Sequence, residues 1–587
     1  MTAHARHRHH LLALLALLLL LPARPAPTQD PAPADPAAPP APAWRAEMRD
    51  VQIPMRDGKS LAANVLLPTT PGKYPCILVQ TPYNKDRMGR EFGDDDDAPG
   101  GALNAGRGSQ KAFAKFDRNN YGWIFVDWRG FYASKAAAQG QNRRGWKRGQ
   151  DGYDCVEWIA AQSWSDGKVG TWGGSALGKQ QFDTATEQPP HLVCAVPLIA
   201  AQGFRYSTYY EGGVQIESAV KAHDRLGFGV GQFVNGNRLP SRMWDLAERL
   251  SYHPERINVP CLLVSGWWDN YPREVIEHFN DILSKGKGKA GESKLIMGPW
   301  SHTAIDIVEQ GDLKFPDAEF YSTNITTQFF DYYLRGKLDS GWKAQPRVHM
   351  FQCGEGWVTG DSVAALQGKP RTMYLHVDGV IRDAAPTAPA PAADGSTDPL
   401  TRAFDFNPAK ASPTIGGQNL PPLTHGPKDC ASIERRGDVL VYRTAELTAP
   451  LCIRGEIALR IPFSCNRTDA DLHVRVCDSV GASSGAHSYL VGETCIRASL
   501  RDGKAEQFLT AGQVVELELR LPPHAYTFAP GHRLTLIITG ASVPRYETND
   551  KAGDVVETLY HQPDRCARLA LPVVDPLKKS DESERTR

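Results

Sequence analysis

The sequence predicts an α/β domain followed by an all-β domain, and three observations lead to this fold class. At 587 residues the chain is too long for one hydrophobic core, so it should hold two or three domains. Strand-like apolar runs alternate with helical stretches from about Trp44 to Ala200, as a parallel sheet covered on both faces requires. From Gln345 onward, short β-type runs alternate with Gly, Pro, Asp and Asn turns, which is typical of an antiparallel sandwich.

The first 43 residues precede these domains and carry a targeting pattern. Arg6 and Arg8 come before an apolar run over 11–21, and small residues follow it, which predicts a signal peptide over 1–26. Residues 27–43 are almost wholly Pro, Ala and Asp, so we expect an extended, disordered spacer. The apolar run is too short to span a bilayer and no second one exists, so no stable membrane insertion is expected. The protein is therefore predicted to be exported, either to the periplasm or to the medium.

Composition excludes several classes of partner. Lys plus Arg and Asp plus Glu each number 66, so net charge gives no argument for nucleic acid or for an anionic membrane. The sequence contains no dinucleotide fingerprint and no phosphate-binding loop. Its eleven cysteines show no zinc-ligand spacing. We expect no metal and no organic cofactor, while the cysteines crowded into the last third leave one or two disulfides of unknown pairing open.

A small-residue turn over 169–178, Val-Gly-Thr-Trp-Gly-Gly-Ser-Ala-Leu-Gly, follows an apolar strand end. A serine hydroxyl is free to attack a carbonyl when it projects from such a turn, and small neighbours let the chain pass close to itself. Gly173 and Gly178 flank Ser175, although the usual motif has its second glycine where this chain has Leu177. Ser175 is therefore either a nucleophile or an ordinary turn serine, and its partners decide between these interpretations.

Two later strands supply candidate partners. The run 260–266 reads as a buried strand and is followed by Trp267, Trp268 and Asp269, and the run 294–297 ends in a Gly-Pro break before His302. The order Ser, Asp, His and the place of each residue at a strand's carboxyl end are those of an α/β-hydrolase. The competing interpretations are that Asp269 caps the helix beginning near Pro272, and that His302 is one of seventeen histidines lying on a loop.

Several further segments resemble one family in consistent order from about residue 44 to residue 576. They are the opening hairpin 51–68, Thr-Pro-Tyr-Asn-Lys at 81–85, Val-Asp-Trp-Arg-Gly at 126–130, Asp-Gly-Tyr-Asp-Cys-Val-Glu-Trp at 151–158 and Gly-Pro-Trp-Ser-His at 298–302. The chain is thereby similar to the cocaine esterase and X-Pro dipeptidyl-peptidase superfamily. The resemblance implies an α/β-hydrolase domain over 44–344 with a short helical cap at 202–259, a jelly-roll sandwich over 345–576, and a charged tail at 577–587.

The resemblance also implies roles for individual residues. Ser175 would be the nucleophile, His302 the general base and acid, and Asp269 the group that orients His302. Tyr83 would donate its phenol hydrogen to the oxyanion, together with the backbone N–H of Ala176. The alternative for Tyr83 is simple turn chemistry before Asn84. Family members usually have a tyrosine where this chain has Ala176, so its pocket lacks one aromatic wall.

The predicted reaction is acyl transfer from a small-molecule ester or amide to water through an acyl-enzyme. A dipeptidyl peptidase or an α-amino-acid ester hydrolase needs carboxylates that bind the substrate's ammonium group, and Glu211 and Glu217 are the nearest candidates. Each is more readily interpreted as a solvated charge on a helix or loop, so a carboxylic ester hydrolase is favoured. The alternatives are an X-Pro dipeptidyl peptidase, an α-amino-acid ester or β-lactam acylase, and a non-catalytic exported carbohydrate- or wall-binding protein.

The substrate pocket is less well defined by the sequence. Trp267 and Trp268 either line an acyl pocket or pack beneath the catalytic residues, and Glu211 is a tentative third pocket residue. The cap is short for this family, which favours an open cleft that admits bulky substrates. The sequence makes no prediction of the oligomeric state.

Overall fold

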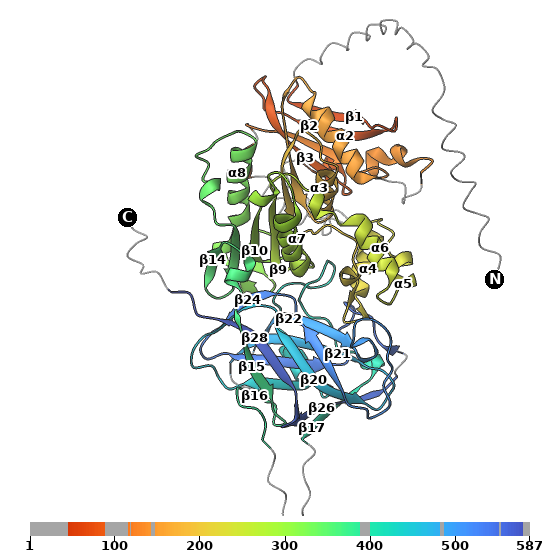
Figure 1. The fold of residues 1–587 in the computed structure, drawn as a ribbon, viewed down its shortest axis with the longest axis vertical. Helices are drawn as coiled ribbons and strands as arrows, with labels where there is room; N and C mark the ends of the chain where they lie inside the picture. The colour runs from red at the N-terminus through yellow and green to blue at the C-terminus, as the bar shows by residue number, and fades with distance from the viewer. Residues whose placement is uncertain are drawn as a thin grey trace, which may run out of the picture. The chain divides into compact units, whose positions relative to one another are not determined.

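A ten-stranded mixed sheet is the framework of the first domain (Figure 1). The computed structural model describes residues 45–88, 115–117, 119–141, 147–387, 400–481, 487–550 and 553–578. In sheet order the strands are β1 (Glu47–Pro54), β2 (Ser60–Leu66), β4 (Gly122–Asp127), β3 (Tyr74–Thr81), β5 (Ser165–Gly174), β6 (Leu192–Leu198), β9 (Leu262–Trp268), β10 (Lys294–Ser301), β13 (Val348–Gln352) and β14 (Gly356–Gly360).

The middle of this sheet is parallel and its two edges are antiparallel. Strands β4, β3, β5, β6, β9, β10 and β13 run parallel, whereas β1–β2, β2–β4 and β13–β14 are antiparallel pairs. Every residue of β9 is buried, as is every residue of β3 after Tyr74. Continuous apolar strands of this kind form where a parallel sheet is covered on both faces.

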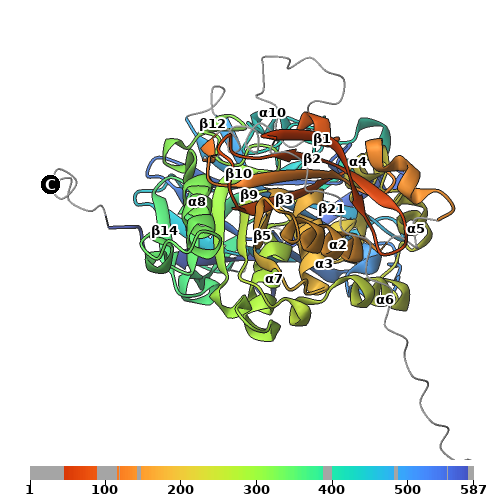
Figure 2. The same ribbon diagram turned by 90° about the horizontal axis from the view of Figure 1, so that it is seen from above.

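Helices cover both faces of the sheet (Figure 2). They are α2 (Arg148–Ala160), α3 (Ala176–Thr186), α7 (Pro272–Lys285) and α8 (Tyr321–Tyr333). Neighbouring residues of β5 identify the two faces, because successive strand residues point to opposite sides. A Cβ at Gly170 would lie 3.4 Å from Phe330 of α8, whereas the Thr171 hydroxyl donates to Gln181 of α3 over 3.0 Å.

The first sheet continues past residue 344, where the sequence placed the end of the α/β domain. Strand β13 pairs with β10 and β14 pairs with β13, so Val348–Gly360 belongs to the first sheet. The composition of this segment is that of a β domain, and only its hydrogen-bond partners reveal which sheet it joins. The first sheet therefore extends two strands past the predicted boundary at 344–345.

A helical cap lies between β6 and β9 along the chain. It contains the short strands β7 (Tyr210–Glu211) and β8 (Val214–Gln215) and the helices α4 (Glu217–Arg225), α5 (Gly231–Gly236) and α6 (Arg242–Ser251). Trp244 is buried at its centre, with its ring 5.4 Å from that of Phe204 and 4.9 Å from that of Phe233. A second insertion, after β10, holds the paired strands β11 (Glu309–Gln310) and β12 (Leu313–Lys314).

The second domain is an all-β sandwich. Its longest path of paired strands is β17 (Thr401–Phe406), β26 (Val555–Gln562), β20 (Ala458–Cys465), β28 (Arg568–Val574), β15 (Lys369–Leu375), β16 (Val380–Arg382), β18 (Leu440–Thr444), β25 (Arg533–Thr539), β21 (Asp471–Val480) and β22 (His487–Arg497). Four further strands pair with strands of this path or with one another: β19 (Leu451–Gly455), β23 (Val515–Arg520), β24 (His524–Phe528) and β27 (Arg565–Cys566). The short helix α9 (Val363–Leu366) precedes β15, and α10 (Ala431–Glu434) lies between β17 and β18 along the chain. All pairs are antiparallel except β16 with β18 among the strands described.

The two domains are joined by buried hydrogen bonds. Cys353, at the end of β13, donates its N–H to Ala525 over 3.0 Å and accepts from the N–H of Thr527 over 2.9 Å. The indole N–H of Trp268 donates to the carbonyl of Val491 over 3.0 Å. Separating the domains would break these hydrogen bonds and expose the buried groups to water.

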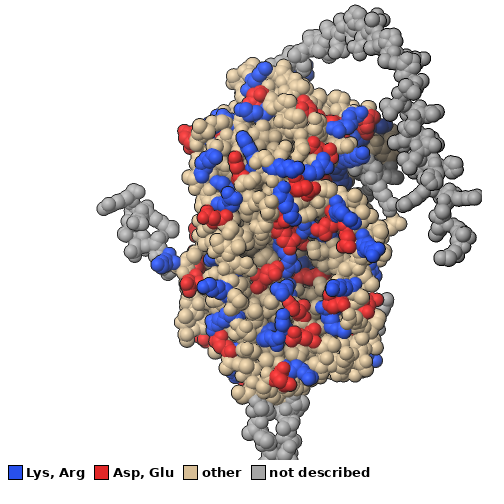
Figure 3. Space-filling model, viewed as in Figure 1, with Lys and Arg blue, Asp and Glu red and all other residues tan. Residues whose placement is uncertain are grey.

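Some predictions fall outside the described residues. The signal peptide over 1–26, the spacer over 27–43 and residues 579–587 of the tail belong to this group. Among the helices that the structure describes, none is long and apolar enough to cross a membrane. All eleven cysteines lie in the described ranges, and each is buried and free. On the face seen in Figure 3, basic and acidic side chains are interspersed, as the zero net charge suggests.

Candidate active site

Ser175 occupies the turn between β5 and α3. Its backbone has φ 58° and ψ −120°, a conformation that side-chain-bearing residues rarely adopt. A Cβ at Gly173 would lie 2.8 Å from the side chain of Leu177, and one at Gly178 would lie 2.6 Å from the Cβ of Ala200. The chain therefore passes too close to itself for larger residues at either glycine, and the Ser175 hydroxyl projects from the top of the turn.

Ser175, His302 and Asp269 form one hydrogen-bonded series. His302 Nε2 lies 2.9 Å from Ser175 Oγ, and His302 Nδ1 lies 2.6 Å from Asp269 Oδ1. A carboxylate accepts only, so Nδ1–H donates to Asp269 and leaves Nε2 to accept from the serine hydroxyl. Asp269 is fully buried and His302 nearly so. The structure thus brings together three residues that span 127 positions of the sequence.

Asp269 is held by a side chain of β9 and by the backbone N–H of the next residue, and it does not cap α7. Ser265 Oγ donates to its Oδ2 over 2.7 Å, and the backbone N–H of Asn270 donates to Oδ1 over 2.6 Å. The residue that precedes α7 is Tyr271, and its side chain makes no capping hydrogen bond. The helix-cap interpretation of Asp269 is therefore not realised.

The loop of His302 is fixed by Gln310, a residue that sequence reasoning missed. The buried Gln310 side chain accepts from the N–H of Ser301 over 2.9 Å and donates to the carbonyl of Ala304 over 2.6 Å. The Tyr271 ring meets the His302 ring edge-on, with centroids 5.9 Å apart. A lone glutamine on a short strand carries no sequence signal for this role.

Tyr83 reaches the same site from the loop after β3. Burial raises the pKa of its phenol to about 12, and hydrogen bonding with the Ser175 side chain and the Ala176 backbone offsets part of that rise. The phenol is therefore neutral over the physiological range and lies beside the two groups that would flank an oxyanion. Asp127 anchors the loop by accepting from the N–H of Lys85 over 2.7 Å.

A small cavity opens beside Ser175, with a volume of about 40 Å³. Its lining is mostly apolar, and among the residues that the structure describes around it there is no carboxylate. The lining residues are Tyr83, Met88, Trp172, Gly174, Ser175, Leu177, Ile199, His223, Leu226, Phe228, His302, Thr303, Leu420 and Pro421. This space is narrower than the open cleft that the short cap suggested, because the cap and a loop of the second domain both contribute to its walls.

His223 of α4 is the polar cavity residue that the sequence did not reveal. Its Nδ1 lies 3.0 Å from the Tyr209 hydroxyl and its Nε2 lies 3.4 Å from the Tyr271 hydroxyl. Burial lowers the pKa of His223 to about 3, so the ring is neutral. With both nitrogens engaged, the imidazole contributes no charge to the cavity.

Trp267 and Trp268 do not line the cavity at Ser175, which corrects one tentative assignment. Both side chains are fully buried, and the Trp267 indole donates to the carbonyl of Phe351 over 2.8 Å. The Trp268 indole donates to the second domain, at Val491. The tryptophans therefore pack beneath the site and join β9 to neighbouring parts of the fold.

Glu211 is also placed away from Ser175, which corrects the other tentative pocket assignment. Its carboxylate accepts from the Tyr546 hydroxyl over 2.5 Å, and it lines a separate cavity of about 600 Å³ between the cap and the second domain. Burial raises the pKa of Glu211, and nearby Arg545 offsets part of that effect. Glu217 pairs with Lys221 of α4 over 2.8 Å.

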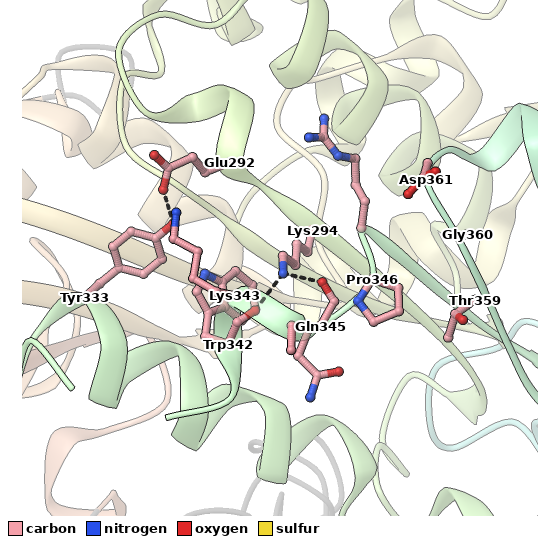
Figure 4. Close-up of a pocket in the computed structure, with 12 residues that line it drawn as sticks. Glu292, Lys294, Tyr333, Trp342, Lys343, Gln345, Pro346, Thr359, Gly360 and Asp361 are labelled. Carbon is pink, nitrogen blue, oxygen red and sulfur yellow. Dashed lines mark hydrogen bonds between the residues drawn. The ribbon is translucent and has the colours of Figure 1, made fainter. Parts of the chain in front are cut away.

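Another cavity, of about 580 Å³, lies at the start of β10 (Figure 4). Lys294 donates there to the carbonyls of Trp342 and Gln345 over 2.8 and 2.5 Å. Lys294 is the first residue of β10, whereas His302 follows its last residue. This cavity is therefore at the other end of the strand from the series Ser175, His302 and Asp269, and it contains none of the predicted site residues.

Comparisons with known proteins show similarity to one family of hydrolases over both domains. The family model of the X-Pro dipeptidyl-peptidase (S15 family) matches residues 57–253 and 241–304, and that of the X-Pro dipeptidyl-peptidase C-terminal non-catalytic domain matches 340–561. Cocaine esterase from Rhodococcus sp. (strain MB1 Bresler) is 24% identical over 600 residues, covering 89% of this chain and 98% of that protein.

Two solved structures share the fold. An aminopeptidase from the marine sediment archaeon Thaumarchaeota archaeon has a TM-score of 0.74 at 20% identity, over 92% of this chain and 99% of that one. An alpha-amino acid ester hydrolase has a TM-score of 0.71 at 20% identity, over 94% of this chain and 100% of that one. At this level of identity the likeness establishes the two-domain fold alone.

Proposed function

The chain belongs to the cocaine esterase and X-Pro dipeptidyl-peptidase superfamily of serine hydrolases, and from that membership we propose that it is a carboxylic ester hydrolase. The observation that carries the proposal is the hydrogen-bonded series of Ser175, His302 and Asp269, with contacts of 2.9 and 2.6 Å. These are the distances at which a base activates a serine hydroxyl and a carboxylate orients that base.

The proposed mechanism uses each group once in each half of the reaction. Ser175 Oγ attacks the ester carbonyl while His302 Nε2 takes its proton, and Asp269 stabilises the imidazolium that forms. The Tyr83 hydroxyl and the Ala176 N–H donate to the oxyanion. His302 then protonates the departing alcohol, and water repeats the same path to release the acid and restore the serine.

The cavity lining favours esters of simple acids over substrates that carry a free ammonium group. An ammonium brought into an apolar site without a carboxylate is strongly disfavoured. The described residues around the cavity supply no carboxylate, and Glu211 lines a different cavity, bound to Tyr546. We therefore do not propose for this chain the activities that the names of the aminopeptidase and the alpha-amino acid ester hydrolase state, although the fold is shared.

We also propose that the protein is exported. Arg6 and Arg8 before the apolar run 11–21, with small residues after it, support this proposal. Sequencing the N-terminus of protein recovered outside the cytoplasm should show that residues 1–26 are absent. Recovery of the uncleaved chain from the cytoplasm alone would contradict export.

The first test compares hydrolysis of an aryl acetate with that of an Ala-Pro anilide. Wild type, Ser175→Ala and the control Ser241→Ala are used, since Ser241 is exposed and its side chain makes no capping bond. We expect ester turnover in wild type and Ser241→Ala, its loss in Ser175→Ala, and no anilide cleavage.

Other results discriminate between the alternatives. Anilide cleavage at comparable efficiency would mean that the enzyme binds an ammonium group and is a dipeptidyl peptidase or amino-acid ester hydrolase. Ester turnover that persists in Ser175→Ala would remove Ser175 as nucleophile. Inactivity toward both substrates would favour a non-catalytic binding protein.

A further inference from the structure

We propose that the cavity beside Ser175 is an acyl pocket for short apolar acids, so that the substrates are esters of acids such as acetic, propionic and butyric acid. This inference rests on the proposed function and specifies the substrate class of the same site. Three observations support it: the cavity is small, its walls are held in place by hydrogen bonds and packing, and its lining is mostly apolar.

The volume limits the length of the acyl group. The centre of a water-sized group can move within about 40 Å³ beside Ser175. By the same measure, the cavity that Glu211 lines has about 600 Å³ and the one at Lys294 about 580 Å³, so the space beside Ser175 is small. A short acyl chain suits so small a space. Longer chains require the walls to move.

The walls come from three parts of the chain. Trp172, Leu177 and Ile199 form the base from β5, α3 and the end of β6, and all three are buried. The cap contributes Leu226 and Phe228. The second domain contributes Leu420 and Pro421 from the loop after Ser412. The cavity is thus closed by segments that are distant in sequence.

The wall from the second domain is held by buried hydrogen bonds. Arg545 donates to the carbonyl of Gln418 and, over 2.9 Å, to the side chain of Asn419. Asn419 in turn donates to the carbonyls of Gly416 and Thr424 over 2.7 and 2.9 Å. Moving this loop outward would leave buried polar groups unpaired, which typically costs about 1–3 kcal/mol for each group.

The wall from the cap is held by aromatic packing. The Phe228 ring lies 6.1 Å from that of Trp128 and 5.8 Å from that of His223. His223 is neutral, and both of its nitrogens are bound to tyrosine hydroxyls. The cap therefore presents hydrocarbon and ring surface to the cavity, which suits an apolar acyl chain.

The narrow space beside Ser175 serves the acyl group, because the acyl group and the alcohol leave the enzyme at different stages of the reaction. The acyl group stays covalently attached to Ser175 after the first half of the reaction. The alcohol must leave and water must enter, so the alcohol side needs a path to solvent. Discrimination by cavity size should therefore act on the acid, and a large alcohol should be tolerated.

The experiment measures kcat/KM for the p-nitrophenyl esters of acetic, butyric, hexanoic and octanoic acid. Wild type should act best on acetate or butyrate and at least about tenfold less well on octanoate, since one misplaced methylene alone is worth about tenfold or more. An increase in kcat/KM from acetate to octanoate would overturn the inference.

Two variants enlarge the cavity from different walls. Leu226→Ala and Leu420→Ala each remove a partly exposed side chain, so neither is expected to unfold the protein. In each, the ratio of hexanoate to acetate kcat/KM should rise about tenfold. The matched control is Leu250→Ala, whose side chain lies on α6 with 71% exposure, and it should keep the wild-type ratio.

The outcomes separate this inference from the proposed function. Ester hydrolysis that depends on Ser175 but ignores chain length, with unchanged ratios in both enlarged variants, would overturn the short acyl pocket alone. Ester hydrolysis that survives in Ser175→Ala, or no hydrolysis of any ester, would overturn the proposed function and this inference with it. If the ratio of hexanoate to acetate kcat/KM rises in only one of the two enlarged variants, the end of the acyl chain lies at the wall changed in that variant. This result would also support the inference.

Discussion

Ser175 sits in a turn whose close contacts explain why its motif departs from the usual one. A Cβ at residue 178 would meet Ala200 Cβ at 2.6 Å and the Leu198 carbonyl at 3.0 Å. The close approach therefore falls one position later than in the common motif, and the side chain of Leu177 is free to face the cavity. The sequence was sufficient to predict the turn, because the small residues that form it are neighbours in the chain. It was also sufficient to predict Asp269 and His302, because each of them follows a recognisable strand.

The residues that the sequence misplaced are those whose partners lie far away along the chain. Trp268 bonds to Val491, and Glu211 bonds to Tyr546, in both cases across the junction of the two domains. The sequence around Trp268 and around Glu211 contains no pattern that would predict these partners. His223, Leu226 and Leu420 were missed for the same reason, since only tertiary packing brings them to Ser175.

Tyr83→Phe tests the oxyanion role at the residue scale. Removing one donor should lower kcat about 100- to 1000-fold with little change in KM, because the lost interaction is made in the transition state. Steady-state kinetics on an aryl acetate measure this change, with Tyr132→Phe as control, since Tyr132 is 49% exposed. A rise in KM at unchanged kcat would assign Tyr83 to substrate binding.

The pH dependence of kcat gives an independent test of Tyr83. Burial raises the pKa of its phenol from 10.0 to about 12, so the neutral donor persists to higher pH than in a free tyrosine. Accordingly kcat should not fall as the pH passes 10. The measurement is a pH–kcat profile taken within the range in which the protein stays folded. An alkaline loss centred near 10 that disappears in Tyr83→Phe would contradict the account.

At the scale of elements, strand pairing rather than composition decides where the first domain ends. β13 and β14 resemble the later strands in composition, yet their backbones bond to β10 and to one another. The alternation of strands and helices was sufficient to predict the fold class. It could not assign an edge hairpin to one of two adjoining sheets.

His524 of β24 provides a pH-dependent test of the junction between β9 and the second domain. Its ring lies 6.1 Å from that of Trp268, and burial lowers its pKa from 6.5 to about 4. The folded state therefore holds His524 neutral, and this contribution to stability is present above pH 6.5 and is lost as the pH falls toward 4. The loss should reach about 3 kcal/mol.

His524→Asn keeps a side-chain N–H for the carbonyl of Pro522, which His524 Nδ1 contacts at 2.9 Å, but does not titrate in this range. Denaturant unfolding of both proteins above pH 6.5 and near pH 4 measures the difference. Wild type should lose stability relative to the variant as the pH falls. Parallel pH dependence in the two proteins would mean that His524 titrates normally in the folded state.

On the scale of the whole molecule, the second domain contributes residues to the candidate active site. Leu420 and Pro421 close the cavity at Ser175, and Cys353 of the first domain is bonded to β24 of the second. The sequence predicted both domains in the right order. It could not predict their shared surface, because that surface depends on pairs of residues hundreds of positions apart.

This shared surface predicts a single unfolding transition for the two domains. Separating them would expose the Trp268 indole and break the bonds of Cys353, so neither domain should remain folded after the other unfolds. Calorimetry and circular dichroism in the near and far ultraviolet should give one coincident midpoint. Two resolved transitions would show that the domains are energetically independent.

The central claim is that Ser175 is the nucleophile of a serine ester hydrolase, and reaction with a short-chain alkyl fluorophosphonate followed by peptide mapping tests it most directly. We expect a single phosphonyl group on Ser175, loss of ester turnover in step with labelling, and greatly slowed labelling in His302→Ala. Loss of activity with the label on another residue, or full activity after Ser175 is labelled, would contradict the claim.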